Sequence, residues 1–212
     1  MPKYTHIIWD WNGTLLDDVY LCMQTINTML KKRDLPTLDS VEDYHKVFGF
    51  PVRDYYLRVG FDFDQEPFKD LAVEYIELYH GKTADALLFP DAEKILAGFQ
   101  KDGIHQIILS ASESRNLMLQ MKPFGIEKYF DEILGISNIY AASKIDIGND
   151  YIKRANPDKT VLIGDTVHDK EVADALGVDC ILIANGHQSK EVLRSRGGIV
   201  LHHLVEITNF LL

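Results

Sequence analysis

The 212-residue sequence has little of what marks a secreted or nucleic-acid-binding protein. It contains two cysteines, Cys22 and Cys180, far apart in the chain and among apolar residues, so we expect two reduced, buried thiols. Its 22 Lys and Arg residues are outnumbered by 32 Asp and Glu residues, which gives a formal net charge of −10. Binding to a phosphate backbone requires a basic stripe, and the sequence shows none, so nucleic acid is disfavoured as a partner.

Long hydrophobic runs are also missing. Asp10 interrupts the early apolar run, so the N-terminus does not resemble a signal peptide, and no stretch approaches membrane-spanning length. We therefore expect a cytoplasmic protein without a membrane partner. The sequence gives no indication of an oligomeric state.

What the sequence does contain is a series of short apolar runs with helical patterns between them. This alternation indicates an α/β fold, a doubly wound parallel sheet with helices on both faces. Two of the helical patterns, residues 91–103 and 168–177, end at a glycine. The runs expected to form strands are residues 5–9, 105–110, 160–164, 180–183 and 199–201.

The first two of these strands are separated by nearly half of the chain, which has no convincing strand pattern. Apolar residues repeat there at helical spacing, from Val19 to Leu30 and from Phe68 to Tyr79. We therefore expect residues 16–86 to form a helical cap domain, and residues 1–15 and 87–212 to form the core domain. An insert directly after the first strand lies at the ligand-binding edge of such sheets and is well placed to act as a lid.

Polar side chains follow the predicted strands, at the edge where the carboxyl ends of parallel strands meet. Clustered carboxylates repel one another unless a cation is bound, and a site built from oxygen ligands suits Mg²⁺. A lysine and a hydroxyl beside the metal would cradle a phosphoryl group, and a carboxylate there could attack phosphorus. The residues that carry this hypothesis are Asp10, Ser110, Lys144, Asp165 and Asp169.

Four segments resemble, in order and spacing, the motifs of the haloacid dehalogenase superfamily, whose members are mostly Mg²⁺-dependent phosphatases. They are "DWNGTLLDD", "IILSAS", "SKIDIG" and "VLIGDTVHDKEVADALG". The likeness is greatest to the branch with a helical cap after the first strand, which includes phosphoglycolate phosphatases and β-phosphoglucomutases. It implies a Rossmann-like core, Mg²⁺ as cofactor and a small phosphorylated metabolite as substrate.

The resemblance also implies a role for each matching residue. Asp10 would be the nucleophile and a metal ligand, beside the backbone carbonyl of Asn12 and the carboxylate of Asp165. Asp169 would act through a water or by holding Lys144. The residues expected around the transferring phosphoryl group are Asn12, Gly13, Ser110, Ala111 and Lys144.

Two further residues could either act in the site or simply be exposed on the surface. Arg53 lies where caps of this branch place a substrate-selecting loop, and its guanidinium would suit a second carboxylate or phosphate. An exposed arginine on a helix fits the pattern equally well. His168 could carry a proton, although a solvent-facing histidine at a helix start is favoured.

Asn12 is where the sequence departs from the family pattern. The phosphatases normally have an aspartate there, which protonates the leaving group and then activates water, and an amide cannot transfer that proton. Three hypotheses follow: a phosphatase that is slow or selective for good leaving groups, other family chemistry, or a phosphate-binding or regulatory protein without turnover. Within the second, a mutase is weakened by Asn12, and a phosphonate hydrolase is disfavoured because residues 47–68 contain no lysine.

Overall fold

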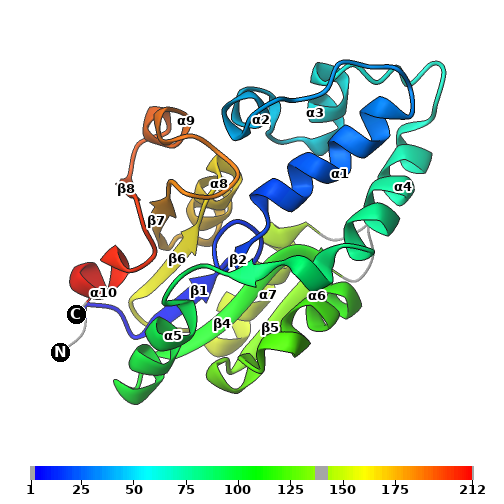
Figure 1. Ribbon diagram of the computed structural model, residues 1–212. Coiled ribbons are helices and arrows are strands. Elements are labelled where there is room, and N and C mark those ends of the chain that lie inside the picture. Colours follow the sequence, from blue (N-terminus) through cyan, green and yellow to red (C-terminus); the bar gives the residue numbers. More distant parts are fainter. Residues whose placement is uncertain (1–2, 137–142, 212) are drawn as a thin grey trace.

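A six-stranded sheet forms the centre of the chain in a computed structural model, which describes residues 3–136 and 143–211 (Figure 1). Each neighbouring pair of strands in this sheet is parallel, in the order β5-β4-β1-β6-β7-β8. The strands are β1 (His6–Trp9), β4 (His105–Glu113), β5 (Glu132–Ile136), β6 (Thr160–Gly164), β7 (Asp179–Ile183) and β8 (Ile199–Leu201). All five predicted runs therefore form strands, and β5 is a further strand that the pattern missed.

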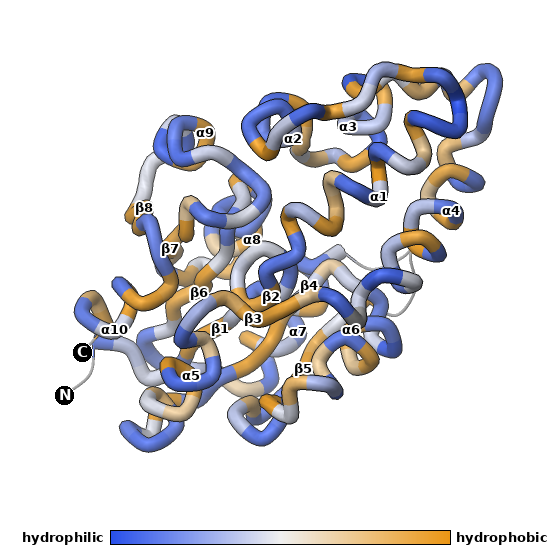
Figure 2. The backbone as a smooth tube through the Cα atoms, viewed as in Figure 1, coloured by the Kyte–Doolittle hydropathy of each residue, from blue (hydrophilic) through white to orange (hydrophobic). Residues whose placement is uncertain are grey.

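Helices cover both faces of the sheet, because alternate residues of each central strand point to opposite sides. On one face, Ile7 and Trp9 pack in a buried cluster with α5 and α10. On the other, Ile8 and Leu162 pack with α7 and α8. Figure 2 shows the hydrophobic stretches on strands such as β6 and β7. The covering helices are α5 (Ala92–Lys101), α6 (Ser114–Met121), α7 (Lys144–Ala155), α8 (Val167–Leu176), α9 (Lys190–Ser195) and α10 (Glu206–Leu211).

The predicted helical insert lies beside the carboxyl end of β1 (Figure 1). Its two long helices pack together, since α1 buries the residues of its apolar repeat and contacts α4. The helices are α1 (Val19–Lys31), α2 (Val41–Val47), α3 (Val52–Arg58) and α4 (Phe68–His80), followed by a 3-10 turn at Thr83–Asp85. The structure thus has the α/β doubly wound parallel sheet with a helical insertion that the sequence indicated.

The expectation that no strand lies between β1 and β4 is wrong at the two ends of the insert. There β2 (Leu16–Asp17) and β3 (Leu87–Leu88) form a short antiparallel ribbon. Two-residue strands are too short to give a recognisable alternation, so pattern analysis could not find them.

The remaining expectations concern cysteines and membranes. Both cysteines are free; Cys22 is buried and Cys180 is half-buried. Among the described residues, no helix is long and apolar enough to cross a membrane.

The end of β4 is irregular, and this irregularity shapes the site described below. The pairing of β4 with β5 shifts register between Leu109 and Glu113. At this point Gly135 of β5 lies against the backbone of β4: a Cβ on Gly135 would be 2.7 Å from the carbonyl oxygen of Ser112. The glycine therefore permits the close approach that places residues 110–112 at the sheet edge.

We expect Gly135→Ala to lower the free energy of unfolding by about 1–3 kcal/mol, because the added methyl group meets backbone that cannot rotate away. Chemical denaturation measures this. Gly98→Ala on α5 is the control: nothing lies within 4 Å of the added Cβ, so it should raise the free energy of unfolding by about 0.5–1 kcal/mol. If Gly135→Ala stabilised the protein as much as Gly98→Ala, the close approach of Gly135 to the backbone of β4 would be contradicted.

Candidate active site

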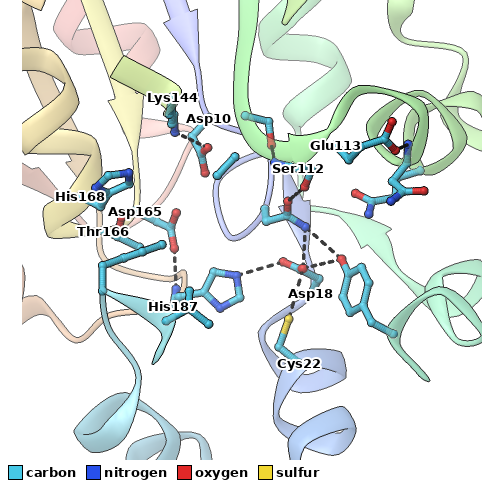
Figure 3. A pocket seen from close by; sticks show the side chains of 18 of the residues that line it. Asp10, Asp18, Cys22, Ser112, Glu113, Lys144, Asp165, Thr166, His168 and His187 are labelled. Carbon is cyan, nitrogen blue, oxygen red and sulfur yellow. Dashed lines mark hydrogen bonds and ion pairs between the residues drawn. The ribbon is translucent and has the colours of Figure 1, made fainter. Parts of the chain in front are cut away.

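A pocket of about 310 Å³ lies between the carboxyl edge of the sheet and the insert (Figure 3). Its floor contains side chains from four separate parts of the core: Asp10 after β1, Ser110 on β4, Lys144 at the start of α7 and Asp165 after β6. These residues lie together because the strands are parallel and β1 sits between β4 and β6.

Three carboxylates and one ammonium group form the centre of this floor. Oxygens of Asp10, Asp165 and Asp169 lie within 4.8 Å of one another, and all three residues are buried. The Nζ of Lys144 donates to Asp10 Oδ1 at 2.5 Å and to Asp169 Oδ1 at 2.6 Å. The three carboxylates are therefore close enough to share one cation, and Lys144 already bridges two of them, Asp10 and Asp169.

Helix caps fix two of these side chains. Asp169 is the third residue of α8, and its Oδ2 accepts hydrogen bonds from the backbone N–H and the hydroxyl of Thr166, which closes a capping box. Lys144 begins α7 directly after the capping residue Ser143, whose partner in a second capping box is Asp146. The caps hold both side chains at helix starts that face the pocket.

Burial and mutual repulsion shift the pKa values of the carboxyls. Burial raises the pKa of Asp10 to about 6, although Lys144 opposes the shift. Burial also raises the pKa of Asp165 to about 8; His187 opposes this, and the nearby charges of Asp169 and Asp10 add to it. Asp169 differs because Lys144 and Thr166 overcome its burial and hold its pKa below the usual value.

These charges fit a divalent cation. Three carboxylates beside one lysine form a cluster with an excess of acidic groups, and burial, together with the charges of Asp169 and Asp10, raises the pKa of Asp165. All the donors are carboxylate oxygens, the ligands that Mg²⁺ prefers. Asp10, Asp165 and Asp169 are accordingly the residues that would hold the metal or orient its waters.

The side chain of Asn12 is held by three partners. Its Nδ2 donates to Asp18 Oδ2 at 2.8 Å and to the hydroxyl of Tyr79 at 2.9 Å, and its Oδ1 accepts from the hydroxyl of Ser112 at 3.0 Å. An ionised carboxylate can only accept, so Asp18 fixes which end of the amide faces it. Asn12 therefore acts here as a donor to Asp18, and neither group offers a proton to the pocket.

Asp18 is the centre of a buried network in Figure 3. Besides Asn12, its carboxylate accepts hydrogen bonds from Gly13 N–H at 2.9 Å and from the hydroxyl of Tyr79 at 2.7 Å. His187 Nε2 lies 3.3 Å from Asp18 Oδ1. Although Asp18 is buried, His187 and these hydrogen bonds lower its pKa, so it remains ionised.

His187 connects this network to the carboxylate cluster and to the insert. Its backbone N–H donates to Asp165 Oδ2 at 2.6 Å, and its Nδ1 lies 2.9 Å from the hydroxyl of Tyr44 on α2. Burial lowers the pKa of this imidazole, but the charge and hydrogen bond of Asp18 outweigh burial and raise it to about 9. The insert is thus joined to the floor through Tyr44 and Tyr79.

The residues expected around a phosphoryl group divide into two sets. Ser110, Ala111 and Lys144 line the pocket, with the hydroxyl of Ser110 buried and accepting from Ser112 N–H at 3.1 Å. The Gly13 N–H is instead engaged by Asp18 and by the carbonyl of Leu16. The structure therefore does not offer the Gly13 amide to a ligand.

The structure does not bring Arg53 to the pocket. Its guanidinium lies over the ring of Phe63, 4.5 Å from the ring centroid, and its side chain is exposed. The turns of α3 explain this, because Tyr55 and Tyr56 form the buried face of that short helix. The hypothesis that Arg53 selects the substrate is accordingly not supported by its position.

His168 is at the start of α8, as predicted. The prediction that it faces solvent is only partly correct. It lines the pocket, and its ring stacks on that of Phe50 with centroids 4.6 Å apart. Its Nδ1 lies 3.5 Å from a carboxylate oxygen of Glu171. The insert residue Phe50 explains the difference, because it covers one face of the imidazole.

Asp18, Tyr79 and His187 were not among the candidates from the sequence. His187 lies in the loop "ANGHQ" after β7, four residues beyond the end of the strand, so a strand-end rule that includes such loops could have found it. Asp18 and Tyr79 gave no such signal, because their importance arises from their contacts with Asn12 and His187 of the core.

These pKa values predict how stability depends on pH and Mg²⁺. The contribution of His187 is complete below its unfolded pKa of 6.5 and is lost as the pH rises through about 9. Asp165 also binds its proton more tightly when folded, so its contribution is lost as the pH rises toward about 8. Without metal, the free energy of unfolding should therefore fall between pH 6.5 and 9.

Mg²⁺ should stabilise the protein more at pH 8.5 than at pH 6, since protons compete with the metal for these carboxylates. Denaturant unfolding with and without Mg²⁺ at both values measures this. Asp165→Asn is the control and should lose most of the Mg²⁺ effect. A Mg²⁺ effect that is independent of pH, or that persists in this variant, would contradict the assigned cluster.

Comparison with known proteins agrees with this architecture. A phosphoglycolate phosphatase from Caulobacter vibrioides is 23% identical over 216 residues, covering 95% of this chain and 88% of that protein. The tyrosine-protein kinase PtkA of Mycobacterium tuberculosis is 23% identical over 205 residues, covering 95% of this chain and 69% of that protein. A haloacid dehalogenase-like hydrolase structure from Streptococcus pneumoniae superimposes with a TM-score of 0.84 at 21% identity, covering 98% of both chains.

The family model for haloacid dehalogenase-like hydrolases matches residues 7–183. This range begins in β1, contains the whole insert and ends with β7, so it includes the strands that carry Asp10, Ser110 and Asp165. The chain belongs to the haloacid dehalogenase-like hydrolase family.

Proposed function

We propose that this hydrolase is a Mg²⁺-dependent phosphatase that cleaves a small phosphate monoester through an aspartyl-phosphate at Asp10. The observation that carries the proposal is the buried contact of Asp10 with Lys144 inside a cluster of three carboxylates, on the floor of a pocket. The names of two relatives, a phosphatase and a kinase, support phosphoryl transfer as the reaction class and leave the substrate open.

In the proposed reaction, a carboxylate oxygen of Asp10 forms a bond to phosphorus while the bond to the leaving oxygen breaks. Water then attacks the phospho-enzyme, releasing inorganic phosphate and restoring the carboxylate. Lys144 and the hydroxyl of Ser110 would hold the phosphoryl oxygens. Mg²⁺ would be held by Asp10, the backbone carbonyl of Asn12 and Asp165, and Asp169 would act through a water or by holding Lys144. The bound metal would offset the repulsion between the anionic nucleophile and the anionic substrate.

We also propose residues 16–86 as the cap and residues 1–15 and 87–212 as the core. The β2–β3 ribbon supports this division, since Leu16 pairs with Leu88 and Asp17 with Leu87 where the chain leaves and re-enters the core. The contacts of Tyr44 with His187 and of Tyr79 with Asn12 support a cap that shields the reaction from bulk water.

Asp10→Asn tests the nucleophile. We expect Mg²⁺-dependent hydrolysis of phenyl phosphate to fall by at least about 10³-fold, because an amide is a poor nucleophile toward phosphorus. Intact mass measurement should detect a phosphorylated species in the wild-type protein and none in the variant. Retained Mg²⁺-dependent activity in Asp10→Asn would rule out this role.

A second candidate is a phosphate-binding or regulatory protein that does not turn over. It is favoured by the contacts of Asn12, whose amide is held by Asp18, Tyr79 and Ser112 and supplies no proton. Under this hypothesis, Mg²⁺ and inorganic phosphate would bind to the wild-type protein, and no ester would be hydrolysed.

The Asn12–Asp18 pair allows a sharper test of proton transfer. Asn12→Asp alone places two buried carboxylates at hydrogen-bond distance, so we expect the free energy of unfolding at pH 7.5 to fall by about 1–3 kcal/mol. The exchange Asn12→Asp with Asp18→Asn restores an amide–carboxylate pair and should recover part of this loss. It also puts an ionisable carboxyl at position 12.

We expect the exchanged variant to hydrolyse alkyl phosphates faster than the wild type by about 10²-fold or more, the usual contribution of a positioned acid–base group. Asp18→Asn alone is the control, since it removes the same carboxylate without adding one at position 12. A stable exchanged variant with no gain on alkyl esters would show that proton transfer at this position does not limit the reaction.

A further inference from the structure

The two sides of the pocket differ in chemistry. The floor carries the charged residues described above, whereas the side formed by the insert is apolar and largely aromatic. We call this side the cap wall; its residues are Cys22, Phe48, Phe50, Val52, Tyr75, Ile76, Tyr79 and His80. A phosphoryl group seated over Asp10 would therefore direct its ester substituent toward the cap wall.

Among the described residues that line the pocket, no lysine or arginine is free to bind a second anionic group on the substrate, and His187 is already paired with Asp18. Lys144 is the only lysine or arginine lining it among the described residues, and its ammonium already contacts two carboxylates. The sequence of residues 137–142, outside the described ranges, contains no lysine or arginine. Arg53 lies over Phe63, and Arg58 donates to the carbonyl of Val47.

One acidic residue makes a second anion still less favourable. Glu113 lines the pocket at the end of β4, where its carboxylate accepts a hydrogen bond from the Asn116 N–H and caps α6 (Figure 3). A carboxylate on the substituent would lose water without gaining a lysine or arginine partner, and the pocket would already contain the like charge of Glu113. The pocket thus disfavours substrates that carry a carboxylate or second phosphate on the leaving group.

The cap wall contains an aromatic ring that is exposed toward the pocket. Phe50 is 36% exposed, and one face of its ring is supported by His168. Phe48 is stacked on Tyr44 with centroids 5.1 Å apart, so it is also held in place. Rigid aromatic side chains of this kind gain most by packing against another flat apolar group.

The contacts of Asn12 independently favour a substrate with an aromatic leaving group. Since Asn12 offers no proton at this position, the pocket favours a leaving oxygen that can depart as an anion. A phenol ionises with a pKa of about 10, as tyrosine does, whereas water has a pKa of about 15.7. An aryl oxygen is therefore a far better unprotonated leaving group than an alkyl one.

We propose that the pocket selects monoesters of phosphate with small, uncharged phenols, whose ring packs against Phe48, Phe50 and Val52. This specificity rests on the phosphatase function proposed above, but the recognition of the ring can be tested without turnover. An aryl phosphate carried on a peptide has the same reacting group, but a pocket of about 310 Å³ favours the free small ester.

Binding of stable phosphonates gives the first test. Isothermal titration calorimetry of the Mg²⁺-loaded wild-type protein should show phenylphosphonate binding about tenfold more tightly than methylphosphonate, which lacks the ring. Phosphonoacetate, which adds a carboxylate, should bind more weakly than methylphosphonate. Equal affinities of phenyl- and methylphosphonate, or tightest binding of phosphonoacetate, would overturn the inference.

Cap variants locate the ring. Phe50→Ala should weaken phenylphosphonate binding about 2- to 10-fold and leave methylphosphonate unchanged. Leu57→Ala is the matched control, because Leu57 is an exposed apolar residue of the same insert, outside the pocket lining. Val52→Arg should reverse the preference toward phosphonoacetate. Equal effects of Phe50→Ala and Leu57→Ala would remove the cap wall from the explanation.

Kinetics then separate this inference from the proposed function. Phenyl phosphate should show a higher kcat than benzyl phosphate, which has the ring but an alkyl leaving group, and a lower KM than acetyl phosphate, which has a good leaving group but no ring. A phosphotyrosine peptide that is hydrolysed faster than phenyl phosphate would overturn the choice of a small ester. If phenylphosphonate binds as expected and no ester is hydrolysed, the phosphatase proposal fails and the ring specificity stands.

Discussion

The geometry of the whole site depends on one buried carboxylate, that of Asp18. It accepts hydrogen bonds from the loop after β1 through Asn12 and Gly13, from α4 through Tyr79, and pairs with His187 after β7. A buried charge is stable only when it is paired and hydrogen-bonded, so these groups must keep their places for Asp18 to stay ionised. The insert, the loop after β1 and the loop after β7 are thereby fixed relative to one another.

This constraint also separates two electrostatic environments that are close in space. Asp18 has its own cation in His187 and is compensated within the protein. The cluster of Asp10, Asp165 and Asp169 has one lysine for three carboxylates and retains a deficit of positive charge. Since the His187 backbone N–H donates to Asp165, the two environments are mechanically linked although only the carboxylate cluster carries an excess of negative charge.

Much of the fold could be predicted from the sequence because parallel strands buried on both faces give continuous apolar runs. The exception, β5, lies at the edge of the sheet and contains Gly135, and none of its residues is fully buried. The convergence of Asp10, Lys144 and Asp169 followed from strand order. The direction of the Arg53 side chain could not be predicted, because position along the chain does not determine which side of a short helix faces a pocket.

The contacts of Asn12 change how an amide at this position should be interpreted. Taken alone, the amide is a missing carboxyl group, and its effect is simply the loss of a proton donor. In the structure, its Nδ2 is the donor that a second buried carboxylate, Asp18, requires, so a carboxylate at position 12 would compete with Asp18 for the same hydrogen bonds. The amide is thus part of the network that holds Tyr79 and the cap wall in place. In the proposed phosphatase, a site organised in this way would give up proton transfer to the leaving group and keep an apolar wall above a charged floor. This combination would favour substrates whose leaving group is apolar and departs readily as an anion.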